Sequence, residues 1–151
     1  MNKVKVLFLC THNSARSQIA EGLLNALYGD KFEAASAGTR PSHVNPFAVK
    51  ALAEIGIDIS LHTSKHVKEF IGKPVDIVVT VCDNAKEECP IFPGAKTQIH
   101  HSFKDPSLET GNDEVRLNAF RKTRDEIKNW LEKDFIGKAG GMLLISQMLN
   151  F

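Results

Sequence analysis

The sequence predicts an α/β fold: a single domain in which a four-stranded parallel sheet forms the middle of a three-layer sandwich. Short apolar runs rich in β-branched residues alternate with longer segments whose apolar residues recur at helical spacing. This alternation is typical of parallel strands joined by helices. The 151 residues suffice for one domain with a sizeable core.

Four short apolar segments are expected to be strands. Residues 4–9 are apolar on both faces, as in a buried parallel strand. Residues 76–81 have β-branched side chains at nearly every position. The other two strands are expected at 32–36 and 97–103.

Helices are expected where apolar residues recur every three or four positions. These segments are 17–28, 46–55, 67–71 and 113–131. Gly29 and Gly56 stand where the first two helices should end. The domain is placed at residues 1–134, and glycines interrupt the C-terminal tail at 135–151. The tail is expected to dock on the domain or to be loosely ordered, and a dimer contact is the alternative.

Composition excludes several classes of protein. The 19 basic and 18 acidic residues give a net charge of +1, and no basic stripe predicts nucleic-acid binding. No apolar run approaches the roughly 20 residues of a membrane span. Three cysteines cannot form a closed disulfide framework and are typical of a reducing compartment. We therefore expect a cytoplasmic protein, and a monomer.

The loop between the first strand and the first helix begins at Cys10 and ends at Arg16. Its amide N–H groups, with those at the helix start, can surround one tetrahedral oxyanion. The expected oxyanion-binding residues are Thr11, His12, Asn13, Ser14, Ala15, Arg16 and Ser17. The helix dipole, the amides and the Ser17 hydroxyl would favour the Cys10 thiolate, a nucleophile. The alternative is a buried cysteine with an unrelated arginine.

Three chemically active side chains follow predicted strands. They are Cys10, Cys82 and Asp105. The carboxyl ends of parallel strands share one edge of the sheet, where ligands bind. We therefore expect all three to meet at that edge.

The segment Cys10-Thr11-His12-Asn13-Ser14-Ala15-Arg16-Ser17 resembles the phosphate-binding loop of low-molecular-weight protein tyrosine phosphatases. It resembles more closely the thioredoxin-coupled arsenate reductases built on that fold. Later matches, in order, are Ser36-Ala37-Gly38-Thr39, His62-Thr63-Ser64, Val81-Cys82, Cys89-Pro90 and Asp105-Pro106. The resemblance implies a phosphatase-like fold, no cofactor and no catalytic metal.

The resemblance also implies a reaction. Cys10 attacks the arsenic of arsenate while Asp105, as general acid, protonates the departing oxygen. Cys82 then attacks the Cys10 sulfur and releases arsenite, after which Cys89 attacks Cys82. Thioredoxin reduces the final Cys82–Cys89 disulfide. Phosphate and sulfate would compete with arsenate.

If residues 82–89 are helical, the Cα atoms of their two cysteines lie roughly 10 Å apart. A disulfide needs them within about 7 Å. The segment must therefore unwind on oxidation, which would present the disulfide to thioredoxin.

Other functions remain open. A phosphatase that hydrolyses phosphotyrosine is the main alternative, although Ser107 stands where phosphatases usually carry an aromatic residue. Weak phosphatase activity is expected in either case. A non-enzymatic oxyanion-binding module would leave Cys10 idle. Further alternatives are inert thiols and a zinc site, whose ligands would be Cys82, Cys89, His100 and His101.

The resemblance includes a potassium site in some reductases, to which Asn13, Glu21 and Ser36 correspond. Those enzymes supply an aspartate where this sequence has Lys65. We expect the Lys65 ammonium to replace the ion, to bond Asn13 and to support the loop. Ala15 stands where several relatives carry a second loop cysteine.

Overall fold

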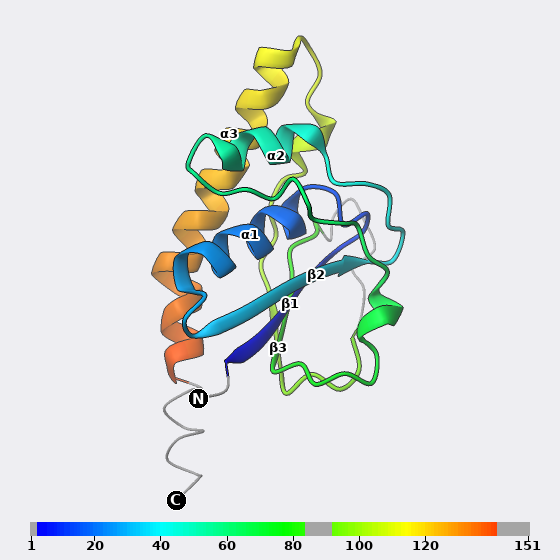
Figure 1. Cartoon of the computed structure of the whole chain (residues 1–151), viewed down its shortest axis with the longest axis vertical. Helices are drawn as coiled ribbons and strands as arrows, with labels where there is room; N and C mark the ends of the chain where they lie inside the picture. The colour runs from blue at the N-terminus through cyan, green and yellow to red at the C-terminus, as the bar shows by residue number, and fades with distance from the viewer. Residues whose placement is uncertain (1–2, 84–91, 142–151) are drawn as a thin grey trace, which may run out of the picture.

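The predicted α/β fold with a four-stranded parallel sheet is confirmed by the computed structural model, which describes residues 3–83 and 92–141 (Figure 1). The strands are β1 (Val4–Cys10), β2 (Phe32–Gly38), β3 (Ile77–Thr80) and β4 (Thr97–His100). The α-helices are α1 (Arg16–Tyr28), α2 (Pro46–Ala53) and α3 (Asp113–Trp130). Two 3-10 helices, η1 (Val67–Phe70) and η2 (Pro106–Leu108), and a π-helical turn, η3 (Leu131–Phe135), complete the elements.

The strands lie in the order β2-β1-β3-β4, and every pair is parallel. From β1 the chain passes through α1 to β2 on one side, and it later returns to β3 on the other side. The carboxyl end of β1 is therefore the point where strand order reverses, which is where ligands bind in open α/β sheets. This end carries Cys10.

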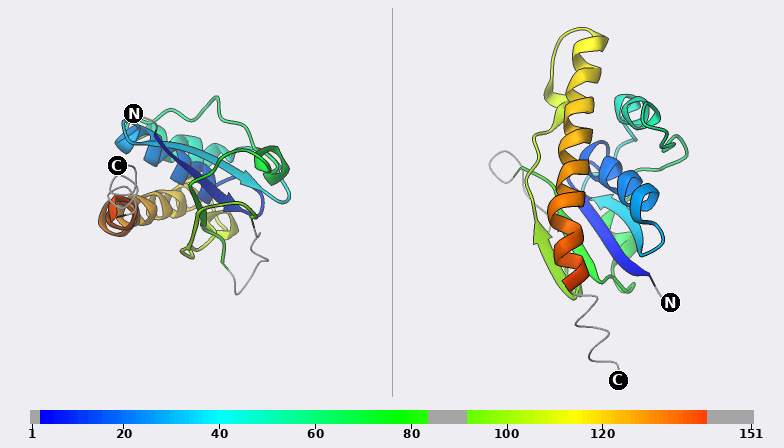
Figure 2. Two further views of the ribbon diagram at one scale, coloured as in Figure 1. Left: turned by 90° about the horizontal axis from the view of Figure 1, so that it is seen from below. Right: turned by 90° about the vertical axis from the view of Figure 1, so that its left-hand side faces the viewer.

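The two faces of the sheet are covered unequally. Helices α1, α2 and α3 pack on one face, over a core that includes Phe8, Leu23 and Phe120. The opposite face is covered by η1 and by residues 92–95, which pack against Leu7 and other apolar strand residues. Figure 2 shows α1 and α3 on one side of the strands and η1 on the other.

β4 is shorter than predicted, because it ends at His100 instead of residue 103. Its neighbour β3 ends at Thr80, and the hydrogen bond from His101 N–H to Thr80 O continues the ladder by one residue. A strand needs a partner for its backbone groups, so the chain leaves the sheet here. This departure brings Phe103 and Asp105 to the Cys10 loop.

The C-terminal helix is longer than the predicted segment 113–131. After Trp130 it widens into η3 and then continues as α-helix to residue 141. Phe135 in η3 is fully buried, and its ring centroid lies 5.6 Å from that of Phe32 and 6.4 Å from that of Phe8. Residues 135–141 therefore dock on the domain, in part within its core.

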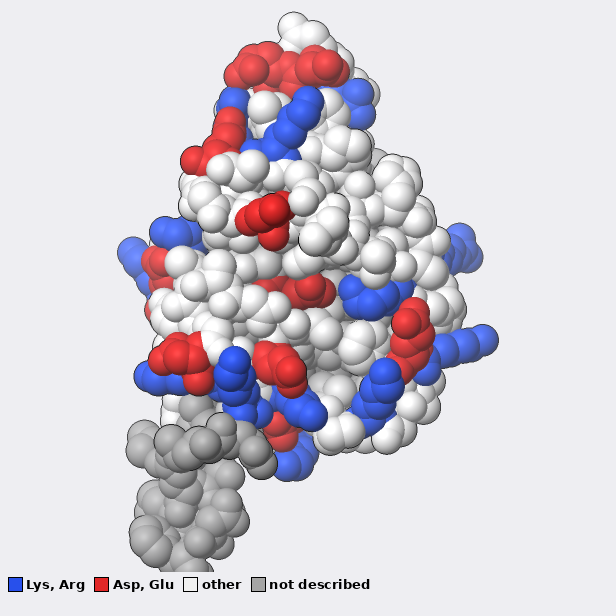
Figure 3. Space-filling model, in the orientation of Figure 1, with Lys and Arg blue, Asp and Glu red and all other residues white. Residues whose placement is uncertain are grey.

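Acidic and basic side chains are interspersed over the face of the molecule in Figure 3. This mixture is consistent with the net charge of +1. Among the described residues, no helix has both the length and the apolar character needed to cross a membrane.

Candidate active site

The loop after β1 has its backbone carbonyls turned outward. The carbonyl oxygens of Thr11, His12 and Ser14 accept hydrogen bonds from N–H groups of the segment 40–45, at 2.9, 3.3 and 2.9 Å respectively. In a planar trans peptide the N–H points opposite to the C=O. The N–H groups of the residues that follow these three carbonyls therefore point toward the inside of the loop. Such a set of inward amides is an anion-binding concavity.

Gly38, at the end of β2, permits the loop to lie against the sheet. A Cβ atom there would lie 2.4 Å from the Thr11 carbonyl oxygen and 2.7 Å from that of Cys10. These contacts are with backbone atoms, which cannot move aside without moving the loop. The Ser36-Ala37-Gly38-Thr39 match thus has a physical basis in the close approach of the two backbones.

Asn13 supports the loop from within. It is fully buried, and its φ of 50° lies in the left-handed region, which asparagine tolerates better than most residues. Its Oδ1 accepts hydrogen bonds from Lys65 N–H at 2.8 Å and from Gln18 Nε2 at 3.1 Å. Its Nδ2 donates to Ser17 Oγ at 2.8 Å.

Cys10 is a free thiol with 2% exposure, at the start of this loop and beside the N-terminus of α1. Its Sγ lies 2.8 Å from Ser17 Oγ. Ser17 Oγ already accepts a hydrogen bond from Asn13, so the Ser17 proton is available to Sγ. The inward amides, the helix N-terminus and this hydroxyl thus all lie around the Cys10 end of the loop.

Arg16 and Asp105 lie together at the mouth of the loop. The Nη1 of Arg16 donates to the Phe103 carbonyl at 3.1 Å, and its Nη2 lies 3.6 Å from Asp105 Oδ2. The other Asp105 oxygen, Oδ1, accepts from the N–H and the hydroxyl of Ser107, at 2.9 and 2.7 Å. Ser107 thus holds the carboxyl group with Oδ2 directed toward Arg16. The predicted meeting of Asp105 with the Cys10 loop is confirmed.

Cys82 follows β3, the strand beside β1. The register pairs Leu9 with Thr80, and Val81 N–H donates to Leu9 O at 3.0 Å. Cys82 therefore lies just beyond the level of Cys10 on the neighbouring strand. It is fully buried and disulfide-bonded. Cys89 lies outside the described residues, and so does most of the segment 82–89 for which unwinding is predicted.

His100 and His101, two of the ligands in the zinc alternative, have different neighbours. The Nδ1 of His100 lies 2.6 Å from Thr80 Oγ1, whereas the His101 ring stacks on Trp130 with 5.0 Å between ring centroids. Burial lowers the pKa of His101. Among the described residues, no group of three His, Cys, Asp or Glu side chains could hold a metal ion.

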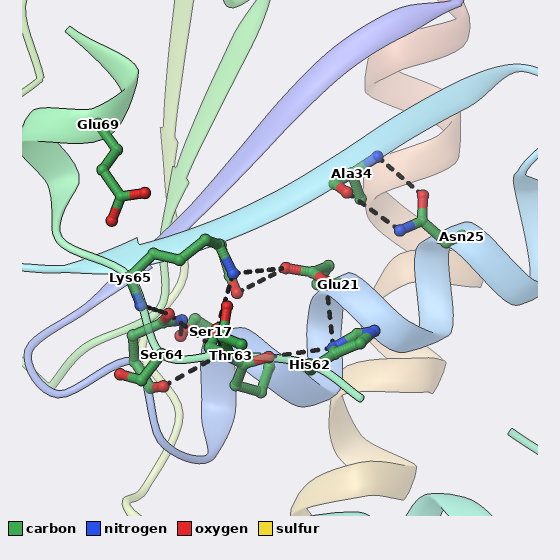
Figure 4. A network of polar contacts seen from close by, with 12 residues as sticks. Ser17, Glu21, Asn25, Ala34, His62, Thr63, Ser64, Lys65 and Glu69 are labelled. Carbon is green, nitrogen blue, oxygen red and sulfur yellow. Dashed lines mark hydrogen bonds and ion pairs between the residues drawn. The ribbon is translucent and has the colours of Figure 1, made fainter. Parts of the chain in front are cut away.

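A buried carboxylate behind the loop is surrounded by donors (Figure 4). Glu21, 7% exposed, accepts from Ser36 Oγ at 2.7 Å and has its Oε2 3.1 Å from His62 Nδ1. Its Oε1 lies 3.8 Å from Lys65 Nζ, which also donates to the Thr63 carbonyl at 2.8 Å. The charged groups of Glu21 and Lys65 thus compensate each other.

The expectation that the Lys65 ammonium bonds Asn13 is wrong, because a different atom of Lys65 makes this bond. The hydrogen bond to Asn13 comes from the Lys65 backbone N–H, whereas the ammonium reaches Glu21 and Thr63. The physical reason is charge: a buried carboxylate attracts an ammonium more strongly than a neutral amide does.

Sequence reasoning missed the role of Gln18 and His62 in this arrangement. Gln18 is fully buried, and its Oε1 lies 3.1 Å from His62 Nδ1. The one available signal was a long polar side chain in α1 next to strongly apolar positions. His62 stood out only through its place in a matching segment.

Comparisons with known proteins place this site in context. The family model for low molecular weight phosphotyrosine protein phosphatase matches residues 5–137. An arsenate reductase of Halalkalibacterium halodurans is 46% identical over 127 residues, which are 84% of this chain and 91% of that protein. A solved arsenate reductase in the phosphate binding state has a TM-score of 0.75 at 32% identity, over 89% of this chain and 98% of the other. A thioredoxin-dependent arsenate reductase of Corynebacterium glutamicum has a TM-score of 0.62 at 27% identity, over 86% of this chain and 61% of the other.

Proposed function

We propose that this chain, which belongs to the low molecular weight phosphotyrosine protein phosphatase family, reduces arsenate to arsenite. The observation that carries the proposal is a free Cys10 in an amide-lined loop with a second cysteine, Cys82, almost level with it on the adjacent strand. Phosphate-ester hydrolysis uses one thiolate and a water. Reduction needs thiols that supply two electrons, and neighbouring cysteines can do so.

Arsenate is proposed to bind within the loop 10–16, where the inward N–H groups would donate to its oxygens. The Arg16 guanidinium would add two parallel donors from the open side. Phosphate and sulfate have the same tetrahedral shape and would compete. The relative described in a phosphate binding state supports this part of the proposal.

In the first step the Cys10 thiolate attacks arsenic and displaces one oxygen. Asp105 gives one proton to that oxygen, which is a hydroxyl group of the bound arsenate, so that it leaves as water instead of as hydroxide. The contacts of Ser107 hold the Asp105 carboxyl beside Arg16. When Arg16 binds the oxyanion, its guanidinium would either release the Phe103 carbonyl or donate to both the carbonyl and the oxyanion.

In the second step Cys82 attacks the sulfur of Cys10. The sulfur–arsenic bond breaks and its electron pair stays on arsenic. Arsenite then leaves, and a Cys10–Cys82 disulfide remains in the protein. Cys89 then attacks Cys82, which frees Cys10 and leaves a Cys82–Cys89 disulfide. A disulfide at Cys82 alongside a free Cys10 supports this last, oxidised state of the proposed relay.

Thioredoxin is the proposed reductant of the last disulfide, and the thioredoxin-dependent relative supports it. Exchange requires an accessible disulfide, which the unwinding of 82–89 would supply. The protein is proposed to act as a cytoplasmic monomer.

A second candidate function is phosphotyrosine hydrolysis, which the family description favours. The same loop would bind the phosphate group, and water would break the phosphocysteine. Ser107 bonds Asp105 and offers no ring to hold a phenyl group. We therefore propose phosphatase activity only as a weak side reaction.

Asn13, Ser17 and Lys65 are proposed to support the loop. Asn13 and Ser17 form the hydrogen-bond chain to Cys10. Lys65 contributes a backbone donor to Asn13 and an ammonium that balances the buried Glu21. We propose that this ammonium makes a bound potassium ion unnecessary.

The experiment that tests the relay is arsenate-dependent NADPH oxidation in the presence of thioredoxin and thioredoxin reductase. We expect turnover by the wild type, and none by Cys82→Ser or Cys89→Ser. Each serine variant keeps the side-chain size but cannot form a disulfide. Cys10→Ser is the control that removes the first step.

The phosphatase candidate predicts a different result. Under it, the wild type shows no arsenate-dependent turnover. Hydrolysis of p-nitrophenyl phosphate would then be abolished by Cys10→Ser and left unchanged by Cys82→Ser and Cys89→Ser.

A further inference from the structure

We infer that Gln18 is a positioning residue for Cys10: its side-chain amide sets the direction of the hydrogen bonds that reach the thiolate. This inference rests on the proposed role of Cys10 as a nucleophile. The hydrogen bonds of Gln18 among the described residues join it to Asn13, Thr63 and His62, and not to Cys10. It acts through Asn13 and Ser17.

The orientation of the Gln18 amide follows from its partners. Its nitrogen Nε2 lies 3.2 Å from Asn13 O, 3.1 Å from Asn13 Oδ1 and 3.0 Å from Thr63 O. Only the NH₂ end of the amide can donate to oxygen acceptors, and its two hydrogens are shared among these three. The oxygen Oε1 therefore faces His62 Nδ1, 3.1 Å away.

The tautomer of His62 follows in turn. Its Nδ1 lies 3.1 Å from Gln18 Oε1 and 3.1 Å from Glu21 Oε2, and both of these atoms are acceptors. Nδ1 must therefore carry a proton. The side chain of Gln18 is thus held at both ends, by an N–H of His62 and by three oxygens.

The Gln18 donor also fixes the orientation of the Asn13 side-chain amide. The Asn13 oxygen Oδ1 accepts from Gln18 and from the Lys65 backbone, so the Asn13 NH₂ group must face Ser17 Oγ. Ser17 Oγ accepts from Asn13 and lies 2.8 Å from Cys10 Sγ, so its hydroxyl proton can donate to the sulfur. This donation is available to a Cys10 thiolate, which can only accept a hydrogen bond.

The contribution of Gln18 should be graded, because Lys65 supplies a second donor to Asn13 Oδ1. Removal of Gln18 leaves that donor in place, and Thr63 O still accepts from Lys65 Nζ. It takes away the Gln18 donor to the Asn13 carbonyl oxygen. Loss of a donor to a buried acceptor is costly, so the loop around Asn13 would shift to compensate. The hydrogen bond to the thiolate would weaken without being lost.

The test is alkylation of Cys10 by iodoacetamide in the fully reduced full-length protein, followed by mass spectrometry of the Cys10 peptide. The variant is Gln18→Met, which keeps the length of the side chain without its hydrogen bonds. At pH 6 we expect alkylation to slow about threefold to tenfold, the change that corresponds to one net hydrogen bond. At pH 9 the two rates should come closer together, because high pH favours the reactive thiolate in both proteins.

Gln18→Glu is a second variant of the same shape, and it should slow alkylation at pH 6 in the same direction because a carboxylate cannot donate to Asn13. His62→Phe is the matched control. It removes the donor to Oε1 and leaves the three Nε2 contacts, so its effect should be smaller than that of Gln18→Met.

Two results would overturn the inference: unchanged alkylation at pH 6 in both Gln18 variants, or equal slowing at both pH values. Failure of the proposed function has a different signature. In that case wild-type Cys10 would itself react slowly at pH 6, and added phosphate would not protect it, as expected for an idle thiol.

Discussion

At the scale of single residues, the site depends on a few positions where the backbone has little freedom. Asn13 adopts a positive φ, and Gly38 lies against the carbonyls of Thr11 and Cys10. Both positions place peptide groups so that carbonyls face outward and N–H groups face the inside of the loop. An anion site of this kind works only if every amide keeps its direction.

Gly38→Ala is therefore expected to damage oxyanion binding. The added Cβ would meet backbone atoms at 2.4 and 2.7 Å, so the loop must move. A displacement of this size can cost up to about a hundredfold in rate. Phosphate affinity by calorimetry and arsenate turnover would both show the loss.

Gly137→Ala is the matched control, since a Cβ at Gly137 meets nothing within 4 Å. In a helix, alanine is favoured over glycine by roughly 0.5–1 kcal/mol, so this variant should be as active as the wild type. Equal affinity in Gly38→Ala and wild type would contradict the close approach at this position.

At the scale of elements, the irregular segment 62–66 acts as a brace for the loop and for α1. Gly38 N–H donates to Lys65 O at 2.9 Å, and Gly38 pairs with His66 in an isolated bridge. The segment thereby extends the edge of β2. Ser64 Oγ donates to His12 O at 2.9 Å, so the brace also reaches the loop itself.

Lys65→Ala is expected to make the activity dependent on potassium. The variant keeps the backbone donor to Asn13 but leaves Glu21 without its ammonium. A buried carboxylate without a balancing charge is unfavourable, and a bound cation would restore the balance. Arsenate turnover should fall several-fold in sodium chloride and recover in part in potassium chloride.

Lys68→Ala, three residues further on, is the control for loss of a positive charge, because Lys68 is exposed. The wild type should have the same activity in both salts. A clear preference of the wild type for potassium over sodium would contradict the proposed role of the ammonium.

At the scale of the whole molecule, the core continues past residue 134, the limit expected for the domain. Phe135 packs against the rings of Phe8, Phe32 and Trp130, with centroid distances of 6.4, 5.6 and 5.5 Å. Ala139, one helical turn later, is 1% exposed. The C-terminal helix is thus part of what holds α1 and the sheet together.

Phe135→Ala is expected to lower the free energy of unfolding by about 3–5 kcal/mol, as for other fully buried aromatic residues. Urea denaturation followed by circular dichroism would measure it. Leu61→Ala is the control, because Leu61 is 92% exposed and its loss should change stability by less than about 0.5 kcal/mol. A similar small change in Phe135→Ala would mean that this part of the helix adds little to the core.

Local pattern was enough to predict much of this protein. The strand that ends at Cys10, the loop of five residues and the helix that begins at Arg16 are contiguous, so hydrophobic period and spacing reveal them together. The parallel sheet follows from the alternation of strands and helices. The shared edge of Cys10, Cys82 and Asp105 follows from that topology.

Tertiary structure alone decided the rest, because it depends on residues far apart in the chain. The contact between Asn13 and Lys65 spans 52 positions, and that between Arg16 and Phe103 spans 87. The periodicity of apolar residues does not indicate which atom of Lys65 reaches Asn13. Nor does it indicate that the Gln18 side-chain amide donates to Asn13. Such pairings arise from how buried polar groups satisfy one another once the core has formed.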